Sequence, residues 1–453
     1  MAEVDLLVAG GMVVTPQGRR RANVAVLDGR IVSVGVEAPS ARETVDASGL
    51  LVMPGAVDTH VHLMDPGSPE REDFPSGTRA AAASGVTTIV EHTHGRPVRT
   101  VEDLEEKIRY LDNLSNVDFG LAAHAWPGEA DVVPALWRAG ITFFKVFTCT
   151  THGVPGYNAA ALRDHLSAAA LSGAVTLMHC EDESLTEVAE ALLQSQGRND
   201  PGVLPEWRSL DAELVAVAVA TLMVRRTNAR AAIAHVSNQE VASYVAAERR
   251  RGAKIAAESC PQYFLLREDE VHEHGTLRKF TPPARSRTED DEAQMWRLLR
   301  DGVLTFMSSD HAPATLEQKA AGDIWNVHFG LPGLDSTMAI MLDAAARGRL
   351  AYEDVTHVYS DTAAKHYGLW PRKGRLGAGA DADILLVDPA VKRVLRNENV
   401  LSKAGWTPFD GRSVTGQVVR TYLRGRLVAE DGKCSDERTG RFLPGAGSAA
   451  SIR

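Results

Sequence analysis

Six side chains of metal-binding type lie at or near the ends of apolar segments in this chain. They are His60, His62, Lys145, His179, His235 and Asp310. His60 and His62 close one apolar run, and side chains two apart on a strand point to the same face, so both imidazoles can reach one ion. Imidazole and carboxylate ligands suit divalent Zn, Mn or Fe. The pattern predicts a metal site, provided that the fold brings these residues together.

Lys145 is the unusual member of this set because it lies inside an apolar segment, residues 141–147. Burial disfavours the charged ammonium and frees the neutral amine. An ammonium offers no lone pair to a metal, whereas a neutral amine can add carbon dioxide and become a carbamate whose two oxygens could bridge two ions. The alternative is a structural lysine whose amine extends toward the solvent, and the segment alone favours neither interpretation.

Asp310 ends another apolar segment, in the sequence SSDHAP at residues 308–313. A carboxylate beside a metal-bound water can bind the ion and also accept the proton of that water. Two metals about 3.5–4 Å apart would lower the pKa of the water and polarise a substrate carbonyl. These residue types therefore predict metal-assisted hydrolysis with Asp310 as the general base.

The elements that must position these residues alternate between strand and helix patterns through the middle of the chain. Candidate strands cover residues 56–62, 86–92, 117–124, 141–147, 174–179, 231–236, 254–258 and 304–310. Helical patterns lie between them, for example at residues 72–84 and 210–225. Eight strand–helix repeats favour an α/β protein with a (β/α)8 TIM barrel, whose active site lies at the carboxyl ends of the strands. The alternative, a doubly wound open sheet, would not bring these strand ends together.

Both ends of the chain read as short strands and tight turns. Residues 5–14, 23–27 and 30–34 near the start, and 383–387, 414–423 and 426–429 near the end, are strand-like. We predict that the two ends form one small β-sandwich domain, with parts at residues 1–53 and 371–432, and that the barrel at residues 54–370 is inserted between them. Residues 433–453 form a C-terminal tail, which we expect to be flexible or a subunit contact.

Composition limits the classes of partner and compartment. The net charge is −10, which argues against nucleic acid or an anionic membrane as a partner. The sequence has no apolar run long enough to span a membrane and no signal-peptide pattern at its start. Four cysteines are widely spaced and form no C-x-x-C motif, which favours a reducing compartment. We expect a cytoplasmic protein.

Several of these segments resemble motifs of the amidohydrolase superfamily. They are PGAVDTHVHL at residues 54–63, FKVF at 144–147, HCED at 179–182, AHVS at 234–237, SDHAP at 309–313 and GRLGAGADAD at 374–383. The chain is most similar to the cyclic amidohydrolases, which include hydantoinase/dihydropyrimidinase, allantoinase and dihydroorotase. The resemblance covers about residues 5–430 and fills all six metal positions.

The resemblance implies a role for each ligand. His60, His62 and Asp310 would hold one metal, and His179 and His235 the other. Lys145, modified to N6-carboxylysine, would bridge both ions together with a hydroxide. That hydroxide would attack the ring carbonyl, and Asp310 would take its proton and pass it to the departing ring nitrogen. Zinc is the expected metal, with Mn or Fe as alternatives, and relatives of this kind are dimers or tetramers.

The sequence predicts the substrate less directly than the metal ligands. The resemblance places ring-binding groups near Thr281, Phe329 and Gly330. Dihydroorotases carry an arginine two residues after the second histidine, where this chain has Met64, and a methionine cannot pair with a carboxylate. Dihydropyrimidinases carry a tyrosine near the oxyanion, five residues after the bridging lysine, and this chain has Thr150 there, which we assign to substrate binding along with Met64. Met64 and Phe329 could form an apolar pocket for a ring substituent, or Met64 could simply pack against the barrel rim.

These residues favour a hydantoinase- or allantoinase-like hydrolase of cyclic amides or ureides, with dihydroorotase as the alternative. A non-catalytic scaffold related to dihydropyrimidinase would have lost metal ligands, and this chain lacks none of the six. A mononuclear deaminase would lack the bridging lysine. Four more histidines lie near strand ends, and we interpret them as polar rim residues: His92, His94, His124 and His152.

Overall fold

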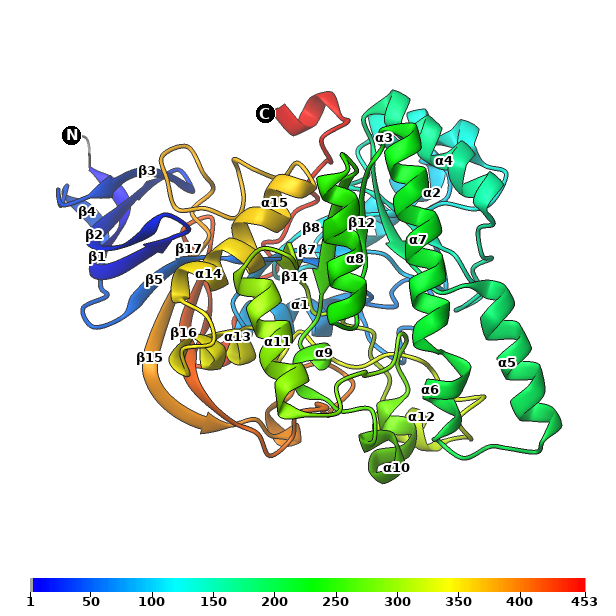
Figure 1. Cartoon of the computed structure of the whole chain (residues 1–453). Coiled ribbons are helices and arrows are strands. Elements are labelled where there is room, and N and C mark those ends of the chain that lie inside the picture. The colour runs from blue at the N-terminus through cyan, green and yellow to red at the C-terminus, as the bar shows by residue number, and fades with distance from the viewer. Residues whose placement is uncertain (1–2, 453) are drawn as a thin grey trace.

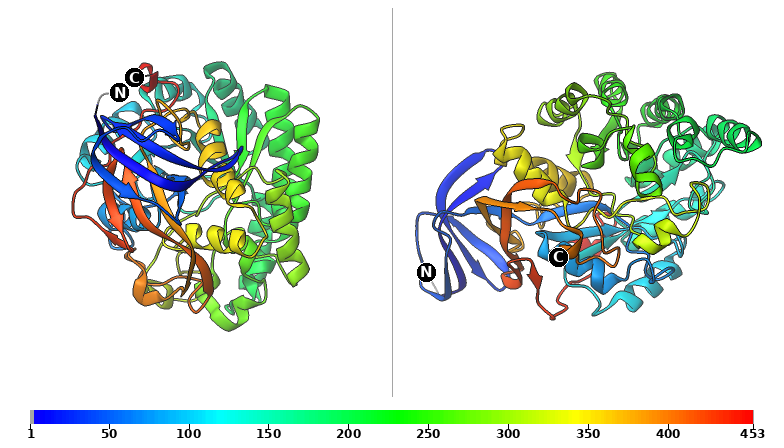
Figure 2. Two further views of the ribbon diagram at one scale, coloured as in Figure 1. Left: turned by 90° about the vertical axis from the view of Figure 1, so that its left-hand side faces the viewer. Right: turned by 90° about the horizontal axis from the view of Figure 1, so that it is seen from below.

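The computed structural model describes residues 3–452 and contains one large mixed sheet built from both ends of the chain. Its strands are β1 (Val4–Thr15), β2 (Gly18–Leu27), β3 (Arg30–Gly35), β4 (Ala41–Asp46), β5 (Leu51–Pro54), β15 (Ile384–Val394), β16 (Ser413–Leu423), β17 (Arg426–Glu430) and β18 (Lys433–Cys434). Antiparallel pairing of β5 with β15 joins the two halves, and Figures 1 and 2 show them on the same side of the molecule. The prediction that both ends form one β-unit is confirmed.

The turns of this sheet follow from residue type. Asp28 and Gly29, between β2 and β3, both have positive φ, 51° and 74°, as a tight type I′ hairpin requires. Arg424 and Gly425 form the equivalent turn between β16 and β17, with φ values of 47° and 74°. Both turns lie in the gaps between predicted strands, at residues 28–29 and 424–425. The domain boundaries drawn from the sequence stay a prediction.

All eight predicted barrel strands are present and run parallel. They are β6 (Ala56–Val61), β7 (Val86–Glu91), β8 (Asp118–Leu121) continued by β9 (Ala123–His124), β10 (Phe144–Phe147), β11 (Val175–His179), β12 (Arg230–Ile233), β13 (Lys254–Ser259) and β14 (Phe306–Met307). They pair in the orders β6-β7-β8 and β14-β13-β12-β11-β10-β9. Backbone hydrogen bonds from Thr142 to Leu121 and from His62 to His311, both 2.8 Å, link these two sheets to each other. The arrangement agrees with the predicted barrel.

Helices cover the outside of these strands, as Figure 1 shows for α7, α8 and α11. The main ones are α1 (Phe74–Ala83), α2 (Val101–Leu111), α3 (Val133–Ala139), α4 (Ala159–Ser172), α5 (Glu183–Ser195), α7 (Leu210–Thr227), α8 (Gln239–Arg250), α11 (Glu289–Arg300) and α13 (Thr337–Ala346). Shorter ones are α6 (Val203–Trp207), α9 (Gln262–Leu265), α10 (Glu270–His274), α12 (Leu316–Ala320), α14 (Tyr352–Thr356) and α15 (Thr362–His366). Asn158, Ser209 and Asn238 cap α4, α7 and α8, which fixes where these helices begin. No helix within residues 3–452 has both the length and the apolar character needed to cross a membrane.

The C-terminal segment packs against the barrel instead of hanging free. Its backbone pairs with β8 through bonds from Phe119 to Arg441 (2.9 Å) and from Leu443 to Phe119 (2.7 Å). A side chain on Gly445 would lie 2.0 Å from the carbonyl oxygen of Ile141, so only glycine permits this approach. Of the two expectations for this tail, flexibility is wrong for the part that the structure describes, because its small residues allow close packing, and a subunit contact stays a prediction.

Candidate functional site

The six predicted residues meet at the carboxyl ends of the strands and line one pocket. They come from five strands: His60 lies on β6 and His62 directly follows it, Lys145 lies on β10, His179 ends β11, and His235 and Asp310 follow β12 and β14. His235 and Asp310 have left-handed backbones, with φ values of 36° and 47°. Such conformations cost energy in non-glycine residues and gather at functional sites.

One half of the cluster is centred on His60. Its Nε2 atom lies 3.1 Å from Nζ of Lys145 and 3.2 Å from Oδ1 of Asp310. Nε2 of His62 lies 3.5 Å from the same carboxylate oxygen. Two imidazole nitrogens, a carboxylate and an amine therefore face one small volume.

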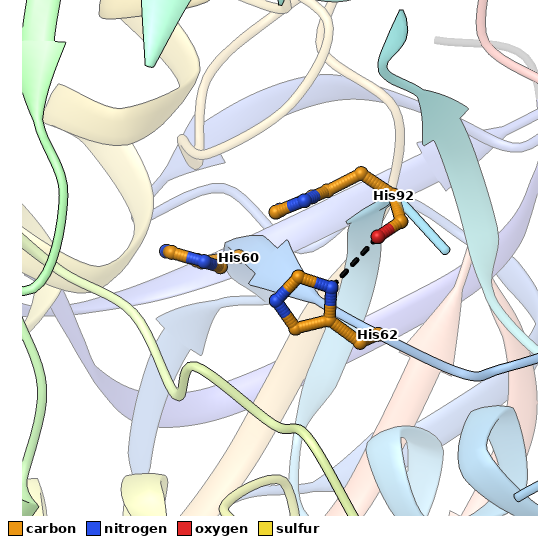
Figure 3. A group of neighbouring side chains, drawn as sticks. All are labelled: His60, His62 and His92. Atoms are coloured by element: carbon orange, nitrogen blue, oxygen red, sulfur yellow. Dashed lines mark hydrogen bonds between the residues drawn. The ribbon is translucent and has the colours of Figure 1, made fainter. Parts of the chain in front are cut away.

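The Nδ1 atoms of these two rings are hydrogen-bonded on the side away from the pocket. Nδ1 of His60 lies 2.5 Å from Oε1 of Glu258, and Nδ1 of His62 donates to the carbonyl oxygen of His92 at 2.7 Å (Figure 3). An acceptor at Nδ1 keeps the proton there and leaves the lone pair on Nε2. This is the usual way in which a protein orients a metal-binding histidine.

The other half of the cluster pairs His179 with His235. Nδ1 of His179 lies 2.9 Å from Nε2 of His235, while its Nε2 lies 2.7 Å from Oε2 of Glu181. Burial would raise the pKa of Glu181, but the charge of Arg208 and hydrogen bonds from His179 and Thr281 outweigh it and lower that pKa to about 2. The ionised carboxylate fixes the proton of His179 on Nε2 and leaves the lone pair of Nδ1 directed toward His235.

The Lys145 side chain is fully buried, so its amine does not extend to the solvent. Burial lowers the pKa of this amine to about 8, although Asp310 and Glu258 act against the shift. A substantial fraction of the amine is thus neutral near pH 8 and can react with carbon dioxide. The alternative of a lysine that reaches the solvent does not fit this geometry.

The predicted ring-binding residues divide into two groups. Thr281, Phe329 and Gly330 line the pocket, whereas Met64 and Thr150 do not. The backbone of Met64 turns with φ 58°, and its side chain is buried away from the pocket. The Thr150 side chain is exposed, and its hydroxyl accepts a hydrogen bond from the backbone nitrogen of Gly156 at 3.1 Å. The structure gives a substrate role for Met64 and Thr150 no support.

The prediction from sequence assigned no role to Glu181 and Glu258, the two carboxylates behind the histidines. Glu258 lies 198 positions from His60 along the chain, so no local spacing could have revealed the pair. Glu181 stands two residues after His179, within the quoted HCED segment. That spacing was an available signal for Glu181.

The wall of the pocket also contains four rings besides the ligand set and Phe329. His94 and His152 are among the residues predicted for the polar rim, whereas Phe147 and Phe280 had no assigned place. Phe329 packs at 5.3 Å from Trp207 and 4.3 Å from the Lys279 ammonium, centre to centre. The pocket therefore combines a polar floor of nitrogen and oxygen donors with partly aromatic walls, which suits a small ring held against metal ions.

Comparisons with known proteins agree with the resemblance. The Amidohydrolase family profile matches residues 51–428. The chain is similar to an allantoinase of Rubrobacter xylanophilus, with 36% identity over 98% of both chains. It is also similar to an L-hydantoinase of Paenarthrobacter aurescens, with 30% identity over 97% of this chain and 98% of the relative. A solved L-hydantoinase (dihydropyrimidinase) from Arthrobacter aurescens superposes with a TM-score of 0.93 and 29% identity, covering 97% and 100% of the two chains.

Proposed function

The chain belongs to the amidohydrolase family, and from this premise we propose that it hydrolyses the amide bond of a cyclic amide or ureide ring. The family is metal-dependent, and the pocket gathers histidines that could bind metal. Relatives named allantoinase and L-hydantoinase match almost the whole length of the chain. A hydantoinase- or allantoinase-like activity is therefore the best-supported function.

One observation carries the proposal: each of His60, His62 and His179 has one ring nitrogen bound to an acceptor and the other turned into the same pocket. Structural histidines have no reason to share this pattern, whereas metal ligands require it. His60, His62 and Asp310 would hold one divalent ion. His179 and His235 would hold the other.

Lys145 would join the two halves as N6-carboxylysine. Its Nζ atom lies 3.1 Å from Nε2 of His60, and full burial favours the neutral amine that carbon dioxide requires. The carbamate would replace the buried amine with an anion that two cations stabilise. Zinc is the first expected metal, and manganese or iron are alternatives for this donor set.

Asp310 is the proposed catalytic base. The bound ions would supply acidity to water and polarise the ring carbonyl. The Asp310 carboxylate faces both His60 and His62, where it can accept the proton of the attacking water. The same acid can then protonate the departing ring nitrogen, so that one side chain moves the proton from nucleophile to leaving group.

The pocket favours an uncharged ring over a carboxylated one. Among the described residues that line it, none is an arginine, and its only lysine is Lys145. Phe147 and Phe329 instead offer apolar surface to a ring substituent. A hydantoin, a substituted hydantoin or allantoin fits this lining better than dihydroorotate, which stays the alternative substrate.

The proposal also covers the compartment, the oligomeric state and the partners of the enzyme. We infer a cytoplasmic homo-oligomer, a dimer or a tetramer, with no nucleic acid or membrane partner. A non-catalytic scaffold is disfavoured because all six proposed ligands are present. Mass measurement of the purified protein in solution tests the oligomeric state.

Ring opening by the zinc-loaded protein in bicarbonate tests the function directly. The panel would hold hydantoin, 5-substituted hydantoins, dihydrouracil, allantoin, dihydroorotate and a cyclic imide. We expect turnover of at least one uncharged ring and none of dihydroorotate. Turnover of dihydroorotate alone would show that another group replaces the missing arginine, and absence of turnover on every ring, with zinc bound, would contradict the proposal.

A further inference from the structure

Three histidines form a second cluster beside the proposed ligands, and the proposed reaction does not use them. They are His92, directly after β7, His94 two residues later, and His124 at the end of β9. One ring nitrogen from each lies within 4.8 Å of the others. We propose that these three side chains bind a third divalent metal ion. The proposal does not depend on which ring the enzyme opens.

The ring nitrogens of this cluster have no hydrogen-bond partners within the described part of the chain. None of the six ring nitrogens of His92, His94 and His124 makes a hydrogen bond of ordinary geometry with any atom of residues 3–452. His92 and His124 are only 1% and 2% exposed. Buried polar atoms in folded proteins nearly always have a partner, so this cluster is built around something that the chain itself does not supply.

Another buried histidine shows that this is not a general feature of the fold. His165 on α4 is also 1% exposed, yet its Nε2 lies 3.1 Å from the hydroxyl of Thr176. The fold therefore satisfies at least one ring nitrogen of a buried histidine where the histidine is structural. The cluster differs because three such rings lie together and none of their nitrogens makes a hydrogen bond of ordinary geometry within the described residues.

The donor set identifies the ligand class. Imidazole nitrogens favour zinc and neighbouring transition metals over magnesium or calcium, which require oxygen ligands. Three histidines with a fourth position open are a known arrangement for zinc. The cluster contains no carboxylate to offset the charge of the ion, whereas the six-residue site contains Asp310. The third ion should therefore bind last and leave first.

The cluster borders the substrate pocket. The ring of His62 lies 4.2 Å, centre to centre, from both His92 and His94. Its Nδ1 bonds to the His92 carbonyl, as Figure 3 shows, and its Nε2 faces Asp310. His94 also lines the pocket. An ion held here would sit behind His62, at the wall of the space where the ring binds.

Metal counting tests the inference on the intact protein. Chelator-stripped protein is loaded with excess zinc in bicarbonate, freed of unbound ions and analysed for zinc per chain. We expect the double variant His94→Gln/His124→Gln to bind one zinc ion fewer than wild type and to keep the others. His165→Gln is the matched control and should leave the count unchanged. Equal zinc counts in wild type and the double variant would overturn the proposal.

Anomalous diffraction at the zinc edge from crystals of the wild-type protein provides a second test that needs no variant to fold. The proposal predicts a peak about 2.0–2.1 Å from one ring nitrogen each of His92, His94 and His124. Ordered water at that point in a zinc-loaded crystal, or zinc bound only elsewhere, would contradict it. Absence of zinc at this point would say nothing about the ring-opening activity. The third metal site and the proposed function are therefore tested separately.

Discussion

The two ends of the barrel both bury charged or polar groups, but the amino end surrounds its buried lysine with carboxylates, whereas the carboxyl end leaves ring nitrogens of buried histidines without a partner among the described residues. At the amino end of β8, Nζ of the buried Lys373 lies 2.5 Å from Asp118, 3.0 Å from Asp381 and 2.8 Å from Asp383. Burial would lower the pKa of Lys373, but these three carboxylates reverse the effect and raise it. This cluster ties the first residue of β8 to the segment that leads into the large mixed sheet.

The carboxyl end has the opposite character. Burial lowers the pKa values of His60 and His235 there, and Nδ1 of His235 has no hydrogen-bond partner among the described residues. The same chain can therefore pair buried charges where stability is at stake. The unpaired donors at the carboxyl end indicate chemistry that needs a ligand from outside the chain.

The largest expected effect at the carboxyl end is that of Asp310→Asn. An amide cannot accept the proton of water, so turnover of whichever ring the enzyme opens should fall by about 100- to 10,000-fold. The fold should be preserved, because the substitution keeps the shape of the side chain. Steady-state kinetics and thermal unfolding of the purified variant measure both. Activity above about a tenth of wild type would remove Asp310 as the base.

At the amino end, Lys373→Met should act on stability alone. It leaves three buried carboxylates without their shared cation, and breaking a buried pair in this way costs about 3–5 kcal/mol. The denaturant midpoint should fall while zinc content and turnover per folded enzyme stay at wild-type values. The control is Arg420→Met, which breaks the exposed Arg420–Glu430 pair (2.7 Å) and should cost under about 1 kcal/mol. A Lys373 variant no less stable than this control would show that the paired cluster at the amino end does not stabilise the fold.

Glu181 is an ionised carboxylate at the carboxyl end of the barrel, where its Oε2 atom accepts hydrogen bonds from His179, Arg208 and Thr281. Its pKa is about 2 in the fold against a usual value of 4.5, so its ionised form contributes about 3 kcal/mol of stability. A lowered pKa means that this contribution is present above pH 4.5 and is lost as the pH falls toward 2. In metal-free protein, the stability difference between wild type and Glu181→Gln should shrink from pH 7 to pH 3. A difference independent of pH would argue against an ionised Glu181.

The smallest effect is expected for Thr150→Ala. Its side chain is exposed and outside the pocket lining, so kcat/KM should stay within about twofold of wild type, as is usual for surface positions. The measurement is steady-state kinetics on the substrate that the panel identifies. A tenfold loss would restore the substrate role that the sequence assigned to this residue.

The sequence predicted the barrel and the ligand cluster because each depends on a local pattern. An apolar segment that ends in His62, His179 or Asp310 reads as a strand with its functional residue at the carboxyl end, and parallel topology then brings the ends together. The strand of Asp310 is shorter than predicted, since β14 covers only Phe306–Met307. The positive φ of Asp310 shows that the backbone has already left the strand there.

The features that the sequence did not predict depend on the direction of a side chain or on contacts between residues far apart in the chain. Met64 was assigned to the pocket by its position after His62, but the turn at φ 58° directs its side chain into the core. Glu258 could not be matched to His60 because 198 positions separate them. The histidines near the ends of β7 and β9 were interpreted one at a time as rim residues. Their importance lies in being unpaired together, which only three-dimensional packing reveals.

The zinc content of Lys145→Ala tests the central claim most directly, because Lys145 is the one residue proposed to join both halves of the site. Wild type and variant would be loaded with zinc in bicarbonate and analysed for metal per chain, with thermal unfolding as the check on folding. The account predicts that the folded variant loses about two zinc ions per chain relative to wild type. A folded variant that keeps its full zinc content would contradict the bridging role and the paired metal site built on it.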